Sequence, residues 1–130
     1  MTLTVDASVI LAVILNEPTK PTLLELTRDA ELQSPPTLPW EVGNALSALF
    51  KRRRIDLAEA KQALVAFASI PVRLADVDLE TCVELANEQD TYAYDAYVLE
   101  CARRYRTPLL SLDGPQCQRA RRLGISVMEV

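Results

Sequence analysis

Short apolar runs alternate along the chain with longer segments in which apolar residues recur every three or four positions. Such short runs, rich in leucine and β-branched residues, are typical of strands. The expected strands are Leu3–Val5, Glu31–Ser34, Val72–Leu74, Leu109–Ser111 and Ile125–Met128. The longer segments predict amphipathic helices. The expected helices cover about 7–15, 19–29, 36–53, 56–69, 79–86, 95–104 and 114–123.

Local signals support several helix ends. The run Asp56-Leu57-Ala58-Glu59 has the spacing of a capping box, and Asp78 is placed to cap the next helix. Pro39 would lie inside a helix that starts near Pro36, so we expect it to distort the first turns. The segment 87–94 is expected to be a loop.

This alternation of strands and helices predicts an α/β fold, namely a three-layer α/β/α sandwich around a mainly parallel sheet. The length of 130 residues predicts one domain, residues 1–130. In such folds ligands bind beyond the carboxyl ends of the strands. Functional side chains are therefore expected just after the strands.

Composition narrows the class of protein. No apolar run approaches the length of a membrane span, and no basic segment precedes the longest one, Val9–Leu15, so we expect a cytoplasmic protein without membrane contact. The three cysteines, Cys82, Cys101 and Cys117, have no zinc-binding spacing and are expected to be reduced thiols.

The chain contains no histidine, which excludes catalytic triads, Cys-His dyads and histidine-rich zinc sites. Its 14 basic and 18 acidic residues give a net charge of −4, which is unusual for a protein that binds nucleic acid. The basic residues nevertheless gather in runs, at 51–54, 103–106 and 119–122. These runs either complete helix C-termini or contact phosphates.

Four acidic residues lie beside apolar runs on separate segments: Asp6, Glu41, Asp95 and Asp113. A carboxylate near a core is costly unless it is hydrogen-bonded, paired or bound to a metal. Each aspartate also has a local interpretation, as a helix cap or a turn residue, but Glu41 has none. Together the four predict a shared cation site, with Mg²⁺ or Mn²⁺ as the preferred ions.

Polar neighbours fit the same site. Asn44 follows Glu41 by three positions, Ser111 precedes Asp113 by two, and Ser8 follows Asp6 by two. Each is a candidate to position a water, a phosphate or a carboxylate, although Ser8 also suits a helix cap. Without histidine, a water activated by a metal ion is the natural nucleophile for hydrolysis of a phosphodiester.

Aromatic residues gather near two of the acids. Trp40 precedes Glu41, and Tyr92, Tyr94 and Tyr97 surround Asp95. These rings either stack on bases or pack in the core or at a subunit contact, and packing is the expected role.

The sequence resembles the PIN-domain ribonucleases and, within them, the VapC toxins of toxin–antitoxin pairs. The resemblance is carried in order by the stretches Val5–Val9, Pro36–Leu46, Tyr94–Val98 and Leu110–Asp113, and by the tail Ala120–Ile125. It implies that Asp6, Glu41, Asp95 and Asp113 form the catalytic quartet, with Asp6, Asp95 and Asp113 as metal ligands. Ser111 replaces the usual threonine, and no further acid follows in 114–117, so a second metal site is in doubt.

The resemblance also implies Mg²⁺-dependent endonucleolytic cleavage of RNA, a homodimer, and inhibition by a small VapB-like antitoxin. The alternative is a PIN-like interaction module without relevant nuclease activity, which the missing acid and the negative charge favour. A receiver or dinucleotide-binding domain is disfavoured, because Asp6 has no acidic neighbour and no glycine-rich phosphate loop is present.

Overall fold

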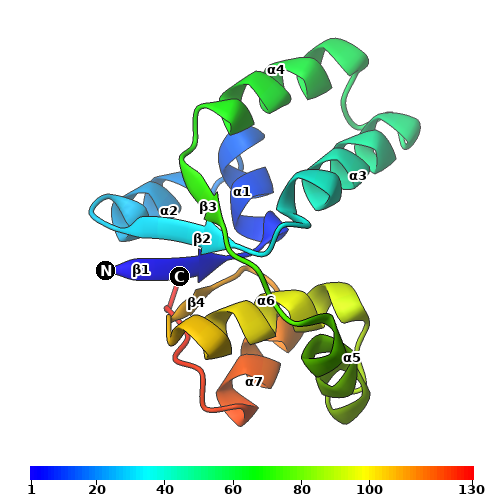
Figure 1. Ribbon diagram of the computed structural model, residues 1–130. Coiled ribbons are helices and arrows are strands. Elements are labelled where there is room, and N and C mark those ends of the chain that lie inside the picture. The colour runs from blue at the N-terminus through cyan, green and yellow to red at the C-terminus, as the bar shows by residue number, and fades with distance from the viewer.

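The computed structural model describes all 130 residues, with a parallel sheet at the centre and helices on both faces (Figure 1). The sheet has four strands in the order β3-β2-β1-β4. Their bounds are β1 Thr2–Val5, β2 Glu31–Ser34, β3 Val72–Leu74 and β4 Leu109–Leu110. Every strand pair is parallel. The expected three-layer α/β/α architecture is therefore confirmed.

The helices divide by chain order between the two faces of the sheet. The first group, drawn above the sheet or beside it in Figure 1, is α1 Ala7–Ile14, α2 Lys20–Thr27, α3 Leu38–Lys51 and α4 Leu57–Ala68. The second group, below the sheet in that view, is α5 Leu79–Glu88, α6 Ala93–Tyr105 and α7 Gly114–Arg122. The switch from one group to the other occurs after the edge strand β3.

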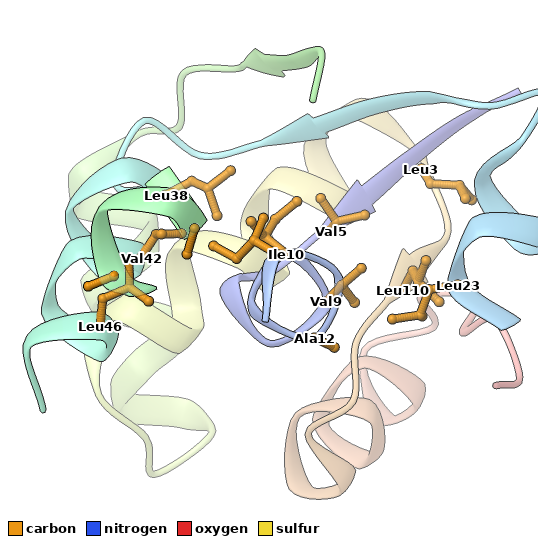
Figure 2. Close-up of a cluster of buried hydrophobic side chains, with 13 residues drawn as sticks. Leu3, Val5, Val9, Ile10, Ala12, Leu23, Leu38, Val42, Leu46 and Leu110 are labelled. Atoms are coloured by element: carbon orange, nitrogen blue, oxygen red, sulfur yellow. The ribbon is translucent and has the colours of Figure 1, made fainter. Parts of the chain in front are cut away.

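Each face has its own apolar core. Leu3 and Val5 of β1 point to the first face, where they meet Val9 and Ile10 of α1 and Leu38 of α3 (Figure 2). The core on the second face joins α5, α6 and α7 through Leu85, Leu99, Leu109, Ala120 and Ile125. Alternate strand residues thus anchor opposite layers, as the two-residue period of a strand requires.

A buried polar network crosses the second face. Gln33 is fully buried, and its Nε2 donates to Oγ1 of Thr4 at 3.0 Å and to Oγ1 of Thr107 at 3.2 Å. Its Oε1 accepts a hydrogen bond of 2.8 Å from Nη2 of Arg73. Because every polar atom of the amide is paired, the network fixes β1, β2 and β3 relative to the loop before β4.

Two expectations about strands need correction. The terminal strand Ile125–Met128 is wrong, because only Val127 forms a bridge, to Leu109. The cause is the shortness of β4, since the chain turns away after Leu110 to start α7. The strand expected over Leu109–Ser111 ends at Leu110 for the same reason.

The other corrections concern helix starts. Pro39 does not distort α3, because the helix begins at Leu38 and Pro39 falls in its first two positions, where no amide donor is needed. The expected loop 87–94 is shorter, since α5 continues to Glu88 and α6 begins at Ala93. The capping box of Asp56 and Glu59 at α4 is confirmed. None of the helices is long and apolar enough to cross a membrane.

We expect Gln33→Ala to lower the free energy of unfolding by about 2–3 kcal/mol, because buried partners lose their hydrogen bonds and a cavity opens. Urea denaturation measures the effect. Gln118→Ala is the matched control, since Gln118 is exposed. Equal stability of the two variants would contradict a structural role for the network.

Candidate active site

The four acids predicted from the sequence lie at the carboxyl edge of the sheet, each at the start of a helix. Asp6 follows β1 and is the N-cap of α1, and Asp113 follows β4 and is the N-cap of α7. Glu41 and Asp95 lie in the first turns of α3 and α6. In Figure 1 the arrow of β1 points to the side of the molecule from which α1 and α3 begin.

Asp6 is at the centre of this arrangement. Its Oδ1 accepts hydrogen bonds from the amide of Ser8, at 3.1 Å, and from the Ser8 hydroxyl, while its Oδ2 accepts one from the Ser111 hydroxyl. Burial raises the pKa of the Asp6 carboxyl, the hydrogen bonds from the serines lower it, and the charge of Asp113 adds to the rise. A partly buried carboxylate is thus held in one orientation with like charge beside it.

The two serines connect Asp6 to the segment that follows β4. Oγ of Ser8 accepts a 2.9 Å hydrogen bond from the amide of Leu112, and Oγ of Ser111 accepts a 3.0 Å hydrogen bond from the amide of Asp113. Ser8 is therefore not the helix cap that the sequence also suggested, because Asp6 occupies the N-cap position and Ser8 is the second residue of α1. Its hydroxyl instead connects the two segments. Asp113 itself caps α7, its Oδ1 accepting from the amide of Gln116 at 3.3 Å.

Glu41 faces the same region. The pKa of its carboxyl is raised from an ordinary value of 4.5 to about 7, mainly by burial and in addition by the charges of Asp6 and Asp95, while the 3.4 Å hydrogen bond from Thr37 Oγ1 opposes the rise. The influence of both aspartates places Glu41 within electrostatic reach of the two neighbouring helix starts. Glu41 lies in the first turn of α3, because the helix begins at Leu38, two residues later than the start expected near Pro36.

Asp95 does not cap α6, since Tyr92 occupies the N-cap position. Its Oδ2 accepts a 2.8 Å hydrogen bond from Thr91 Oγ1 and lies 3.6 Å from Nη1 of Arg119. The buried amide of Gln116 donates to the main-chain carbonyl of Asp95 at 2.8 Å. Helix α7 thus holds the start of α6 through both the backbone and the carboxylate.

Sequence reasoning missed Thr91, Gln116 and Arg119. Thr91 and Asp95 have the four-residue spacing that brings side chains together, which was an available signal. Arg119 was grouped with the basic run 119–122, yet its side chain is only 19 % exposed and is turned inward, whereas Arg121 pairs with Glu129 on the surface. The inward direction of Arg119 and the outward direction of Arg121 follow from the packing of α7 on α6, which the sequence does not show.

Asn44 lies apart from the serine network. It is exposed, makes no side-chain hydrogen bond within the chain, and lines a hollow together with Trp40, Glu41 and Tyr94. Ser8 and Ser111 are therefore joined to Asp6 by the structure, whereas Asn44 is placed beside Glu41 with its amide free.

The donor set suits a hard divalent cation, because it consists of carboxylate oxygens, and the negative charges of neighbouring aspartates raise the pKa of Asp6 and of Glu41. The spacing is open, however, and no three acidic or thiol side chains lie close enough to hold one ion together. Oδ1 of Asp95 accepts no hydrogen bond from the protein and is the oxygen available to a ligand. The ligand set Asp6, Asp95 and Asp113 stays a prediction.

The raised pKa of Glu41 predicts a pH-dependent stability in the absence of divalent ions. Between pH 4.5 and about 7 the folded protein keeps a proton that the unfolded chain releases, so the free energy of unfolding falls as pH rises through this window. Glu41→Gln removes this dependence. We expect the variant to gain roughly 1–2 kcal/mol over the wild type between pH 4 and pH 8, after discounting for solvent screening.

Chemical denaturation at several pH values in EDTA measures this gain, with Glu84→Gln as the control for an exposed glutamate. Parallel pH profiles of the wild type and Glu41→Gln would show that Glu41 ionises normally.

Comparison with solved structures supports the architecture. A crystal structure of PAE2754 from Pyrobaculum aerophilum superposes with a TM-score of 0.71 at 21 % identity, covering 95 % of each chain. A structure of VapBC2 from Rickettsia felis, bound to a DNA fragment from their promoter, gives a TM-score of 0.66 at 14 % identity and covers 99 % of this chain and 98 % of that one. At these identities the similarity establishes the fold.

No curated protein sequence matches the chain significantly. The sequence profile of the PIN domain, in contrast, matches residues 3–122, which contain all four acids, both serines and Arg119. With the fold, the profile and the order of the acids in agreement, the chain belongs to the PIN domain family.

Proposed function

We propose that the protein is a Mg²⁺-dependent endoribonuclease that acts as the toxin of a toxin–antitoxin pair. The observation that carries the proposal is the placement of Asp6, which two serine hydroxyls hold beside Asp113 and within electrostatic reach of Glu41. PIN domains are generally nucleases, and in a chain without histidine these carboxylates are the groups able to support hydrolysis.

The proposed roles follow from the contacts. Asp6, Asp95 and Asp113 are the candidates to hold the cation, and Mn²⁺ is a plausible substitute for Mg²⁺. When bound, the ion would supply water activation and neutralise charge on the phosphodiester. Glu41 is suited to take the proton of the attacking water, because a pKa of about 7 lets a carboxylate accept and release protons near neutral pH.

The surrounding backbone favours an anionic substrate. Four helices, α1, α3, α6 and α7, begin at this edge of the sheet and bring the positive ends of their dipoles towards it. Arg119 adds a full positive charge beside Asp95. These features offset the carboxylates and give a phosphate a favourable approach despite the net charge of −4.

The toxin role rests on the likeness to VapBC2, whose structure contains promoter DNA. By analogy, we propose a VapB-like antitoxin as the partner of this chain, a homodimer as its assembly and the cytoplasm as its location. A cluster of carboxylates is a natural receptor for a basic segment of such an inhibitor.

The alternative is an interaction module without relevant nuclease activity. The open spacing of the carboxylates and the absence of an acid in 114–117 favour it. The two functions differ in whether the acids bind a divalent ion and in whether RNA is cleaved.

We expect Asp95→Asn to reduce RNA cleavage on the order of a hundredfold or more, because it removes charge from the ligand set while keeping the shape of the side chain. Asp90→Asn is the matched control, since Asp90 is exposed and its left-handed backbone, with φ of 49°, also accepts asparagine. Cleavage of labelled RNA and growth arrest on expression are the measurements. Full activity of Asp95→Asn would overturn the assignment.

Divalent ions should also stabilise the fold. If Mg²⁺ binds with a millimolar constant, a tenfold excess over that constant adds about 1.4 kcal/mol. For a domain of this size the melting temperature then rises by about 5 °C. Differential scanning calorimetry with Mg²⁺, Mn²⁺ and EDTA tests this, and the Asp95→Asn protein should respond less. An unchanged melting temperature in the wild type would favour the interaction module.

A further inference from the structure

An aromatic hollow adjoins the acidic residues. It has a volume of about 430 Å³ and is lined by Trp40, Glu41 and Asn44 of α3 and by Tyr94 of α6. This volume lies within the range of sites for small molecules, about 300–1,000 Å³. The hollow spans the first turns of the two helices that carry Glu41 and Asp95, so its occupant would lie next to the proposed reaction centre.

The two rings of the hollow are not explained by the packing of the fold. Trp40 is 76 % exposed and Tyr94 is 57 % exposed, although large aromatic residues normally bury most of their surface. Tyr94 is also supported by a second ring, since the rings of Tyr94 and Tyr97 pack perpendicular to each other, with 5.7 Å between their centroids and an interplanar angle of 85°. A supported yet exposed ring is a preorganised surface for a planar ligand.

We propose that this hollow binds one unpaired base of the RNA substrate, with Trp40 and Tyr94 as stacking surfaces and the free amide of Asn44 as a hydrogen-bond partner for the base edge. The proposal deepens the proposed ribonuclease function and rests on it for the identity of the ligand. It assigns to these rings a binding role in place of the packing role expected from the sequence.

Charge favours a base over a phosphate at this position. Glu41 lines the hollow and the whole chain has a net charge of −4, so an additional phosphate would gain little there. Stacking on an aromatic ring does not depend on charge, and it suits single-stranded RNA, whose bases are free to turn outward. Binding would thus divide between a neutral base on the rings and its adjoining phosphate over the helix N-termini.

An apolar protein surface, such as that of a second copy of the chain, is the competing occupant. Such a contact would cover the two rings but would also bury Glu41 and the unpaired amide of Asn44 against another surface. Burying a carboxylate and an amide without partners is unfavourable. A base, in contrast, brings its own donors and acceptors to these two polar groups.

Trp40 is the only tryptophan of the chain, so its fluorescence reports directly on the hollow. We would titrate the protein with single-stranded hexaadenylate in EDTA, where no cleavage occurs, and with a hexamer of the same phosphate backbone that has abasic sites. We expect hexaadenylate to quench the fluorescence of Trp40 in a saturable way. The abasic hexamer should bind at least about tenfold more weakly, because it lacks the stacking of one base or more.

Variants refine the test. We expect Tyr94→Ala to bind hexaadenylate about tenfold more weakly, whereas Tyr94→Phe retains the affinity. Tyr92→Ala is the matched control, because Tyr92 is 86 % exposed but does not line the hollow. Trp40→Ala and Trp40→Phe are compared by the anisotropy of labelled RNA, and only Trp40→Ala should lose affinity.

Equal affinities for the two hexamers, or equal effects of Tyr92→Ala and Tyr94→Ala, would overturn the base site. A contact between subunits would give a different result: the Trp40 fluorescence would change with protein concentration, and Trp40→Ala would change the mass measured by light scattering but not the affinity for RNA. This result would also overturn the base site. If the protein cleaves RNA with Mg²⁺ but hexaadenylate does not quench Trp40, only the proposed base site is refuted. If hexaadenylate quenches Trp40 but RNA is not cleaved, only the proposed nuclease function is refuted.

Discussion

The candidate site depends on the way in which Asp6 joins two parts of the chain far apart in sequence. Its carboxylate accepts hydrogen bonds from Ser8, just after it, and from Ser111, more than a hundred positions later. Each serine oxygen in turn accepts an amide from the β4–α7 segment. The position of Asp113, and through Gln116 the start of α6, therefore follows from the placement of one side chain at the end of β1.

This arrangement explains why acidic residues can tolerate such a crowded position. The hydroxyl and amide donors around Asp6 compensate in part for its burial, and Arg119 balances part of the charge of Asp95. Glu41 has only a weak contact with Thr37, and its pKa is raised accordingly. The four carboxylates thus differ in environment, which is the condition for dividing ligand and proton-transfer roles among them.

Much of the fold could be predicted because local signals agreed with it, such as the alternation of strands and helices and the capping box at Asp56. The wrong predictions concern segments whose structure is decided by pairing with a distant strand. Residues 125–128 form no strand, because β4 has only two residues and leaves room for one bridge. The order of the acids was visible in the sequence, but Arg119 and Gln116 were not, because their inward direction is set by the packing of α7 against α6.

The start of the chain lies at the amino edge of the sheet, where the N label stands at the beginning of β1 (Figure 1). Met1 is hydrogen-bonded to the first residue of β2, and the C-terminal segment pairs through Val127 with the first residue of β4. The acids occupy the opposite edge. A polypeptide attached before Met1 would therefore leave the molecule on the far side from the site, so an affinity tag or a fused domain at this end would not obstruct the approach of a long polymer.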